Sequence, residues 1–246
     1  MIYPNLLNNF VESNISDFHS KRYARICKLR LKTVLMRKNP YLFKAKNITK
    51  ASELVSGIVD AYLSSQEESI FREFLERLAI YVSEIEYRGV KSSAEGIDLE
   101  FLEQGIRYLV SIKSGPNWGN SSQIRKMEDN FKKAKKILLS NSRNIPVVAI
   151  NGCCYGKEKV QNKGSYLKLC GQDFWEFLTK DADFYLKIIE PLGYRAKQKN
   201  DEFIKEYDKV INLFTREFIE DFCTDGAIDW EKLVRFNSGR ITASSL

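Results

Sequence analysis

The sequence contains a single histidine, His19, and its five cysteines show no C-x-x-C pairing. Zinc sites built from cysteine and histidine usually show such close pairs. A zinc site formed by Cys153, Cys154 and Cys170 is therefore the less favoured alternative. The odd number of cysteines instead indicates free thiols in a reducing compartment.

Long apolar runs are missing as well. No stretch of the sequence approaches the roughly 20 apolar residues that a membrane-spanning helix needs. The N-terminal residues MIYPNLLNNFVESN lack the basic start and the apolar segment of a signal peptide. We therefore expect a cytoplasmic protein that does not associate with a membrane.

Charge and hydrophobic content limit the class of protein. The chain has 246 residues, of which 43% are hydrophobic, so it can bury a substantial core and is expected to form a single domain over residues 1–246. Its formal net charge of +7 fits a polyanionic partner, although soluble basic proteins without such a partner are common.

Hydrophobic periodicity predicts an α/β protein with many helices. The segment NIPVVAINGCCYG, residues 144–156, indicates a buried strand of the parallel type, and residues 166–169 indicate a short strand. Helices are expected over residues 5–38, 49–65, 66–86, 121–139, 172–178, 182–192, 201–224 and 229–236, with a connector over 39–48 and a polar tail over 238–246 that is mobile or contacts a partner.

The polar side chains best suited to catalysis are concentrated between Ser93 and Asn130. One expected strand alternates apolar residues with Asp98 and Glu100, and the return strand, RYLVSIK, places Ser111 and Lys113 on one face. A Gly/Pro/Asn-rich turn then leads into a helix. A carboxylate on one strand beside a lysine on the next suits metal-assisted hydrolysis of a phosphodiester bond.

This layout resembles the PD-(D/E)XK nuclease fold, and the matching residues are Asp98 and Ser111-Ile112-Lys113. The segments IKSGPNWGNSSQ, KNPYLFKAKNI, SSQEESIFREFLERLAI and CGQDFWEFL also resemble parts of certain type II restriction endonucleases. The likeness covers about residues 38 to 178. It implies a mixed central sheet flanked by helices, with a catalytic core over 66–178 and additional helical parts over 1–65 and 179–246.

The resemblance implies Mg²⁺-dependent hydrolysis of double-stranded DNA at a specific sequence. Asp98 would hold the metal, and Lys113 would orient the attacking water or stabilise the developing charge. Ser111 departs from the family pattern, which usually has a second acid there. Glu128 is expected to supply the displaced carboxylate, with Glu100 and Glu76 as alternatives.

The same resemblance implies several contacts and partners. Cutting both strands requires two sites, so a homodimer is expected, and a cognate DNA methyltransferase would belong to the same system without forming a stable complex. The basic helix over residues 5–38 is a candidate contact for the DNA backbone. A solvated helix face without a DNA contact explains its charges equally well. Candidate DNA-binding residues in the turn and helix start are Asn117, Trp118, Asn120, Ser122 and Gln123.

Two other functions fit the same residues. One is a DNA-repair or modification-dependent nuclease on the same core. The other is a DNA-binding protein with a degenerate nuclease core, which the missing acid at position 111 motivates. The single histidine argues against a nuclease that depends on a histidine base.

Overall fold

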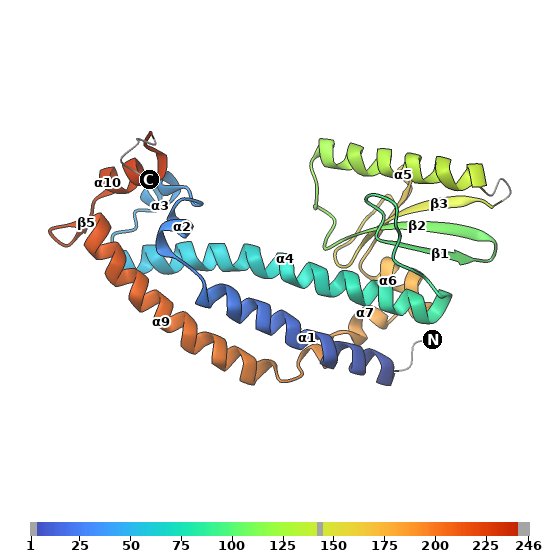
Figure 1. Ribbon diagram of the computed structural model, residues 1–246, viewed down its shortest axis with the longest axis horizontal. Helices are drawn as coiled ribbons and strands as arrows, with labels where there is room; N and C mark the ends of the chain where they lie inside the picture. The colour runs from blue at the N-terminus through green and yellow to red at the C-terminus, as the bar shows by residue number, and fades with distance from the viewer. Residues whose placement is uncertain (1–3, 142–144, 241–246) are drawn as a thin grey trace. The chain divides into compact units, whose positions relative to one another are not determined.

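A computed structural model describes residues 4–141 and 145–240. The chain divides into two compact units. We call them the sheet unit, which takes residues up to Ser16 and Phe71–Tyr194, and the helical unit, which takes Asp17–Ile70 and the residues from Arg195 onward. Helices α1 (Pro4–Cys27) and α4 (Ala51–Tyr87) contribute residues to both units (Figure 1).

The sheet unit is built on four strands in the order β1-β2-β3-β4. Strand β1 pairs antiparallel with β2, whereas β2, β3 and β4 run parallel to one another. The sheet is therefore mixed, and the expected α/β class is confirmed. The strands are β1 (Leu99–Glu103), β2 (Ile106–Lys113), β3 (Val147–Cys153) and β4 (Leu167–Cys170).

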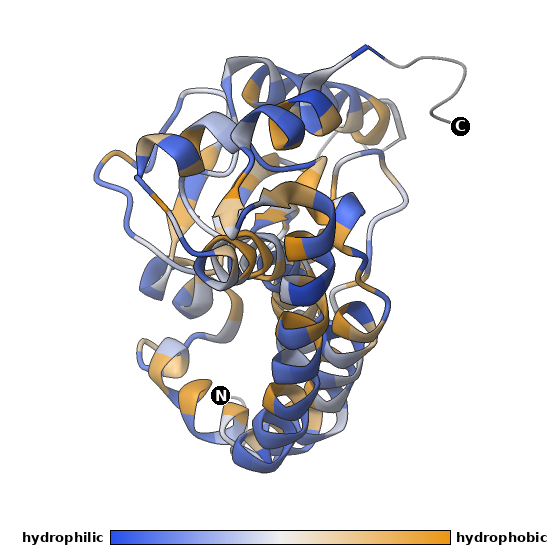
Figure 2. Cartoon of the chain, turned by 90° about the vertical axis from the view of Figure 1, so that its left-hand side faces the viewer, coloured by the Kyte–Doolittle hydropathy of each residue, from blue (hydrophilic) through white to orange (hydrophobic). Residues whose placement is uncertain are grey.

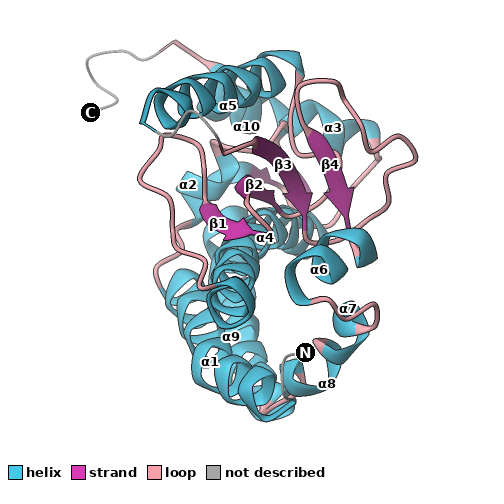
Figure 3. Ribbon diagram, turned by 90° about the vertical axis from the view of Figure 1, so that its right-hand side faces the viewer, coloured by secondary structure: helices cyan, strands magenta, loops and turns pink. Residues whose placement is uncertain are grey.

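Helices cover both faces of this sheet (Figure 3). On one face, helix α5 (Ser121–Asn141) packs Met127 and Phe131 against Leu109 and Ala149 of the strands. On the other face, helix α6 (Gln172–Thr179) brings Phe174 against the backbone of Gly152. Because both faces are covered, the middle of β2 is buried on both sides. The unit ends with the short helices α7 (Phe184–Lys187) and α8 (Ile189–Leu192).

The helical unit has its own hydrophobic core. Hydrophobic and hydrophilic residues both occur along the helices of the protein (Figure 2). The core is formed by residues of α1 and α4 together with α2 (Leu31–Leu35), α3 (Pro40–Ala45), α9 (Ala196–Phe222) and α10 (Trp230–Ser238). A small hairpin, β5 (Cys223–Thr224) and β6 (Ala227–Ile228), joins the last two helices.

The predicted helix over residues 5–38 is wrong in its second half. Helix α1 ends at Cys27, and Arg30 has an extended backbone before α2 begins. Leu29 and Leu31 are both buried in the core of the helical unit. Two residues at that spacing point to different sides of one helix, so burying both requires the chain to turn.

Four other boundaries also differ from the prediction. The expected helices over 49–65 and 66–86 form one continuous helix, α4, which contains no proline. The expected connector over 39–48 contains α3, and the expected helix over 182–192 is divided into α7 and α8. The predicted helix over 201–224 begins earlier, because α9 starts at Ala196. Most of the polar tail, from residue 241, lies outside the described residues.

The expected division at residues 65 and 178 differs from the boundaries of the two units, which lie at residues 16, 70 and 194. A single nuclease domain over the whole chain stays a prediction. Of the described helices, none is long and apolar enough to cross a membrane.

Gly152 allows the close contact between β3 and α6. A Cβ atom at this position would lie 2.1 Å from the Phe174 ring. We expect Gly152→Ala to lower the free energy of unfolding by about 1–3 kcal/mol, because overpacking forces the ring or the strand to move. Denaturant unfolding would measure the change.

Gly57→Ala is the matched control. Gly57 lies within α4, and its added Cβ would make only an ordinary contact of 3.6 Å with Phe43. Alanine is favoured over glycine in a helix by about 1 kcal/mol, so this variant is expected to be at least as stable as the wild type. Equal stability of Gly152→Ala and the wild type would contradict the packing argument.

Candidate active site

Asp98 and Lys113 lie side by side at the carboxyl end of β2. Asp98 directly precedes β1, and its Oδ2 accepts a hydrogen bond of 2.6 Å from the Ile112 amide. The Lys113 ammonium lies 4.0 Å from the same oxygen, and both side chains are about one quarter exposed. The expected proximity of this acid and this lysine is confirmed, whereas their roles stay predictions.

A second carboxylate, Glu76, approaches this pair from α4. Burial raises the pKa of Glu76, and the neighbouring Asp98 carboxylate raises it further. Lys91, whose Nζ lies 4.0 Å from Glu76 Oε1, offsets part of this effect, as do Arg72 and Lys113. Glu76 therefore interacts electrostatically with both Asp98 and Lys113. Its ionised form is destabilised when no cation is bound.

Glu128 and Glu100 are engaged elsewhere. Glu128 Oε1 accepts a hydrogen bond of 3.2 Å from Ser165 Oγ, and Glu100 Oε2 lies 4.0 Å from an Arg107 guanidinium nitrogen. The pKa of Tyr166 is raised mainly by burial and further by the nearby Glu128 carboxylate. Within the described part of the chain, neither acid shows a contact with the Asp98–Lys113 pair.

Ser111 occupies the position where the family pattern usually has an acid. The residue is 1% exposed. Its hydroxyl has no hydrogen-bond partner among the described residues. Its carbonyl accepts a hydrogen bond of 3.3 Å from Asn151 Nδ2. The β2–β3 register places Asn151 directly beside Ser111.

Asn151 also holds Trp118, which lies over Lys113. Trp118 Nε1 donates a hydrogen bond of 3.1 Å to Asn151 Oδ1. The Lys113 ammonium lies 5.1 Å from the centroid of the indole ring, within the range of a cation–π interaction. Because Asn151 is 1% exposed and uses both ends of its amide, it fixes the ring that limits the positions of Lys113.

Asn151 was not identified as a site residue from the sequence. Its one signal is its polarity within the apolar run VVAINGC. A buried amide in a central strand needs partners for its donors and its acceptor, so this position predicts a specific hydrogen-bonding network.

Three of the candidate DNA-binding residues form the cap of α5. Asn120 Oδ1 accepts hydrogen bonds from the Gln123 amide at 3.1 Å and from Ser122 Oγ at 2.7 Å. In return, Gln123 Oε1 accepts from the Asn120 amide at 3.0 Å, which completes a capping box. Asn117 is exposed, so its side chain is open to a ligand.

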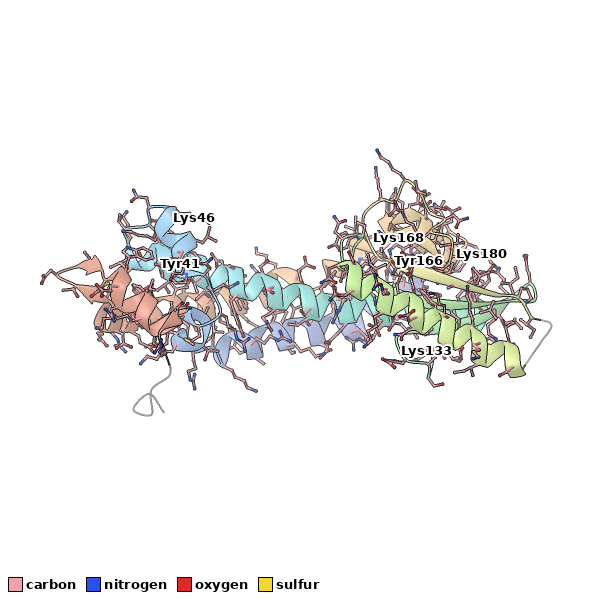
Figure 4. The ribbon with its side chains drawn as sticks, turned by 90° about the horizontal axis from the view of Figure 1, so that it is seen from above. Tyr41, Lys46, Lys133, Tyr166, Lys168 and Lys180 are labelled. Atoms are coloured by element: carbon pink, nitrogen blue, oxygen red, sulfur yellow. The ribbon has the colours of Figure 1, made fainter. Side chains whose placement is uncertain are left out.

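The loop between β2 and α5 is also tied to β4. Lys168 Nζ donates to the Pro116 carbonyl at 2.9 Å and pairs with Glu158 Oε2 at 3.0 Å. Hydrogen bonding by Lys168 is the main cause that lowers the pKa of Glu158 to about 2. Figure 4 shows Lys168 next to Tyr166 in the sheet unit. The sequence did not identify Lys168 or Glu158.

The Asp98 and Glu76 carboxylates suit a hard divalent cation that takes only some of its ligands from the protein. Within residues 4–141 and 145–240, no group of three or more His, Cys, Asp or Glu side chains is placed to hold a metal. Mg²⁺ is usually bound by one or two carboxylates, with waters and substrate phosphates as the other ligands. Asp98 and Glu76 fit this requirement. Burial is the main cause that raises the pKa of Glu76, and a bound cation would offset the additional repulsion from Asp98.

Comparison with protein families gives a match over most of the chain. The family model described as type II restriction endonuclease EcoO109I matches residues 5–200. No curated protein matches the chain. The matched range includes the whole sheet from β1 to β4 together with Glu76, Asp98 and Lys113.

Proposed function

The chain belongs to the type II restriction endonuclease EcoO109I family, and we propose that it is a Mg²⁺-dependent enzyme that cuts both strands of DNA at a specific sequence. Family membership supports a DNA endonuclease that hydrolyses phosphodiester bonds. The observation that carries the proposal is the Asp98–Lys113 pair at the carboxyl end of β2. We assign the site to the PD-(D/E)XK type, with Ser111 in place of the usual acid.

We assign metal binding to Asp98 and Glu76. When bound there, Mg²⁺ would supply positive charge to the scissile phosphate and lower the pKa of a coordinated water. The Asp98 carboxylate is oriented by the Ile112 amide, so its free lone pairs are available to a cation. The coupling between the pKa of Glu76 and the charge of Asp98 favours Glu76 over Glu128 and Glu100 as the second carboxylate.

Lys113 acts on the reacting groups in this proposal. Its ammonium can donate hydrogen bonds to a phosphate oxygen or to the attacking water. Asp98 and the Trp118 ring lie near the ammonium, so the side chain loses little freedom when the substrate arrives. Restricting a reacting group in this way lowers the entropic part of the barrier. Trp118 is therefore a positioning residue as well as a candidate DNA contact.

Double-strand cleavage also requires a second site. We propose a two-fold homodimer, because one such site cuts one strand and a symmetric pair fits the two strands of a duplex. Asn117, Asn120, Ser122 and Gln123 are all exposed. In this proposal Asn117 contacts DNA through its side chain, whereas Asn120, Ser122 and Gln123 contact phosphates through the start of α5. A methyltransferase that protects the same DNA sequence would belong to the system.

One observation favours a second candidate function. Position 111 supplies no carboxylate, and its hydroxyl has no partner among the described residues. A DNA-binding protein that has lost cleavage would show the same feature. Retention of DNA binding by the wild type without any Mg²⁺-dependent cleavage would support that alternative.

Asp98→Asn tests the assignment of the metal ligand. The amide oxygen can still accept the Ile112 hydrogen bond, so folding and DNA binding are expected to persist. Loss of groups that only orient a metal ligand already costs about 10–100-fold, so removal of the ligand charge is expected to lower the cleavage rate by more than about 100-fold. Cleavage rates and metal-free DNA affinity are the measurements.

Glu100→Gln is the control for Asp98→Asn, since it removes one charge from the same strand region. Its cleavage rate is expected to stay within a few-fold of the wild type. Wild-type cleavage by Asp98→Asn would remove Asp98 from the site.

Glu76→Gln and Glu128→Gln distinguish the two candidates for the second carboxylate. Burial, and then the Asp98 carboxylate, raise the pKa of Glu76, so its charge is less favourable than that of an exposed glutamate. Glu76→Gln is therefore expected to be at least as stable as the wild type without divalent cations. Mg²⁺ or Ca²⁺ binding stabilises the folded protein by mass action. The thermal shift caused by either cation should be largely lost in Glu76→Gln and retained in Glu128→Gln, and the cleavage rates should follow the same order. The opposite order would restore Glu128 as the displaced acid.

A further inference from the structure

The positive charge of the protein is concentrated in one segment. Residues 21–50 contain eleven lysines and arginines and no aspartate or glutamate. Since the whole chain carries +7, the rest of the chain has a net charge of −4. Counted by unit, the helical unit carries a net charge of +5, whereas the sheet unit, which contains Asp98 and Lys113, carries +2. Most of the net positive charge that fits a polyanionic partner therefore belongs to the helical unit.

Of these eleven cations, three form ion pairs with carboxylates in the described part of the chain. Lys21 pairs with Asp17, Arg22 with Glu67 and Lys32 with Asp221. The other eight have no carboxylate partner among the described residues, and we call them the cationic surface. They are Arg25, Lys28, Arg30, Arg37, Lys38, Lys44, Lys46 and Lys50.

Several of these side chains are held in place by uncharged groups. Lys38 Nζ donates to the Ala61 carbonyl at 2.9 Å, and Arg30 donates to the Leu29 carbonyl at 3.1 Å. Lys44 lies over the Trp230 ring at 5.3 Å. These contacts position the charges without neutralising them, so less side-chain entropy is lost when an anion binds.

Part of the cationic surface surrounds a pocket of 340 Å³ in the helical unit. Its lining includes Lys21, Arg25, Lys28 and Arg30, together with Thr33 and Tyr62. Cations beside hydroxyl groups offer the charge and the hydrogen-bond donors that a phosphate group needs. The pocket therefore suits one phosphate of a larger polyanion.

The surface around α3 is charged and also exposes apolar side chains. Tyr41 is 61% exposed and Leu42 is 50% exposed, and Figure 4 labels Tyr41 and Lys46 in this part of the helical unit. A second copy of the chain would bring the same uncompensated charges against this face, and like charges repel at short range. A polyanion is thus a better partner for this face than self-association.

We propose that the cationic surface binds the phosphate backbone of double-stranded DNA, outside the base pairs that determine the cut position. The inference rests on the proposed function only in taking DNA as the polyanion. Backbone contacts carry no sequence information and contribute affinity that depends on salt. The surface therefore anchors the enzyme on DNA, whereas the sheet unit carries out the cleavage.

The test replaces four lysines of the cationic surface, Lys28→Gln, Lys44→Gln, Lys46→Gln and Lys50→Gln, in the full-length protein. Each neutralised phosphate contributes about 0.9 to the slope of log affinity against log salt. The slope for a duplex without a cleavage site is expected to fall by about 3 to 4, while the cut position and the rate at saturating DNA stay unchanged.

The matched control removes the same charge from α9 by Lys197→Gln, Lys199→Gln, Lys205→Gln and Lys209→Gln. In α9, Lys199 and Lys209 pair with Glu202 and Glu206. This control is expected to change the slope by less than about 1. Should the first variant fold poorly by circular dichroism, Lys28→Gln with Lys50→Gln replaces it, because neither side chain has a partner among the described residues, and the expected fall is then about 2.

Each outcome decides the inference. An unchanged salt slope in the lysine variant overturns it, even if the wild type cuts DNA. A smaller salt slope in the lysine variant supports the inference. This holds even if the wild type does not cut DNA, because only the proposed function then fails. Normal DNA binding combined with lost binding to phosphatidylserine vesicles would assign the surface to an anionic membrane and also overturn the inference.

Discussion

The hydrogen bond from the Ile112 amide to the Asp98 carboxylate is the interaction on which the candidate site depends. It fixes the residue that precedes β1 against β2, and so brings a carboxylate within 4.0 Å of Lys113. Glu76 adds a second negative charge from α4, and the two carboxylates repel each other. A divalent cation would relieve this repulsion, which links the local backbone geometry to the chemistry of phosphodiester hydrolysis.

Much of the fold could be predicted from local patterns. Alternation of apolar and polar residues located β1 and β2, and the apolar run within residues 144–156 located β3, because strand periodicity is a local property. The break between α1 and α2 could not be found this way. It depends on the burial of both Leu29 and Leu31 in a core whose other members come from distant segments, including α9. The continuity of α4 likewise has no local signal, because the serines and Gln66 in its middle suit a boundary as well as a helix.

The site was predictable where it follows from strand pairing, and not where it follows from tertiary packing. Asp98 and Lys113 come together because adjacent strands of one hairpin place them there. The sequence favoured Glu128, on the flank of the apolar line of α5, but that carboxylate is hydrogen-bonded by Ser165. The choice among Glu76, Glu100 and Glu128 depends on where α4 and α5 lie on the sheet. The contact between Asn151 and Trp118 joins β3 to the loop after β2, and no local pattern predicts a hydrogen bond between such distant residues.

The central claim is that this chain uses the Asp98–Lys113 site to cut DNA at one sequence with Mg²⁺. Digestion of an unmethylated plasmid of known sequence, followed by mapping of the ends, tests this claim most directly. The account predicts Mg²⁺-dependent double-strand breaks at one recurring sequence. No cleavage in Mg²⁺, breaks at random positions, or cleavage only of methylated or damaged DNA would contradict it.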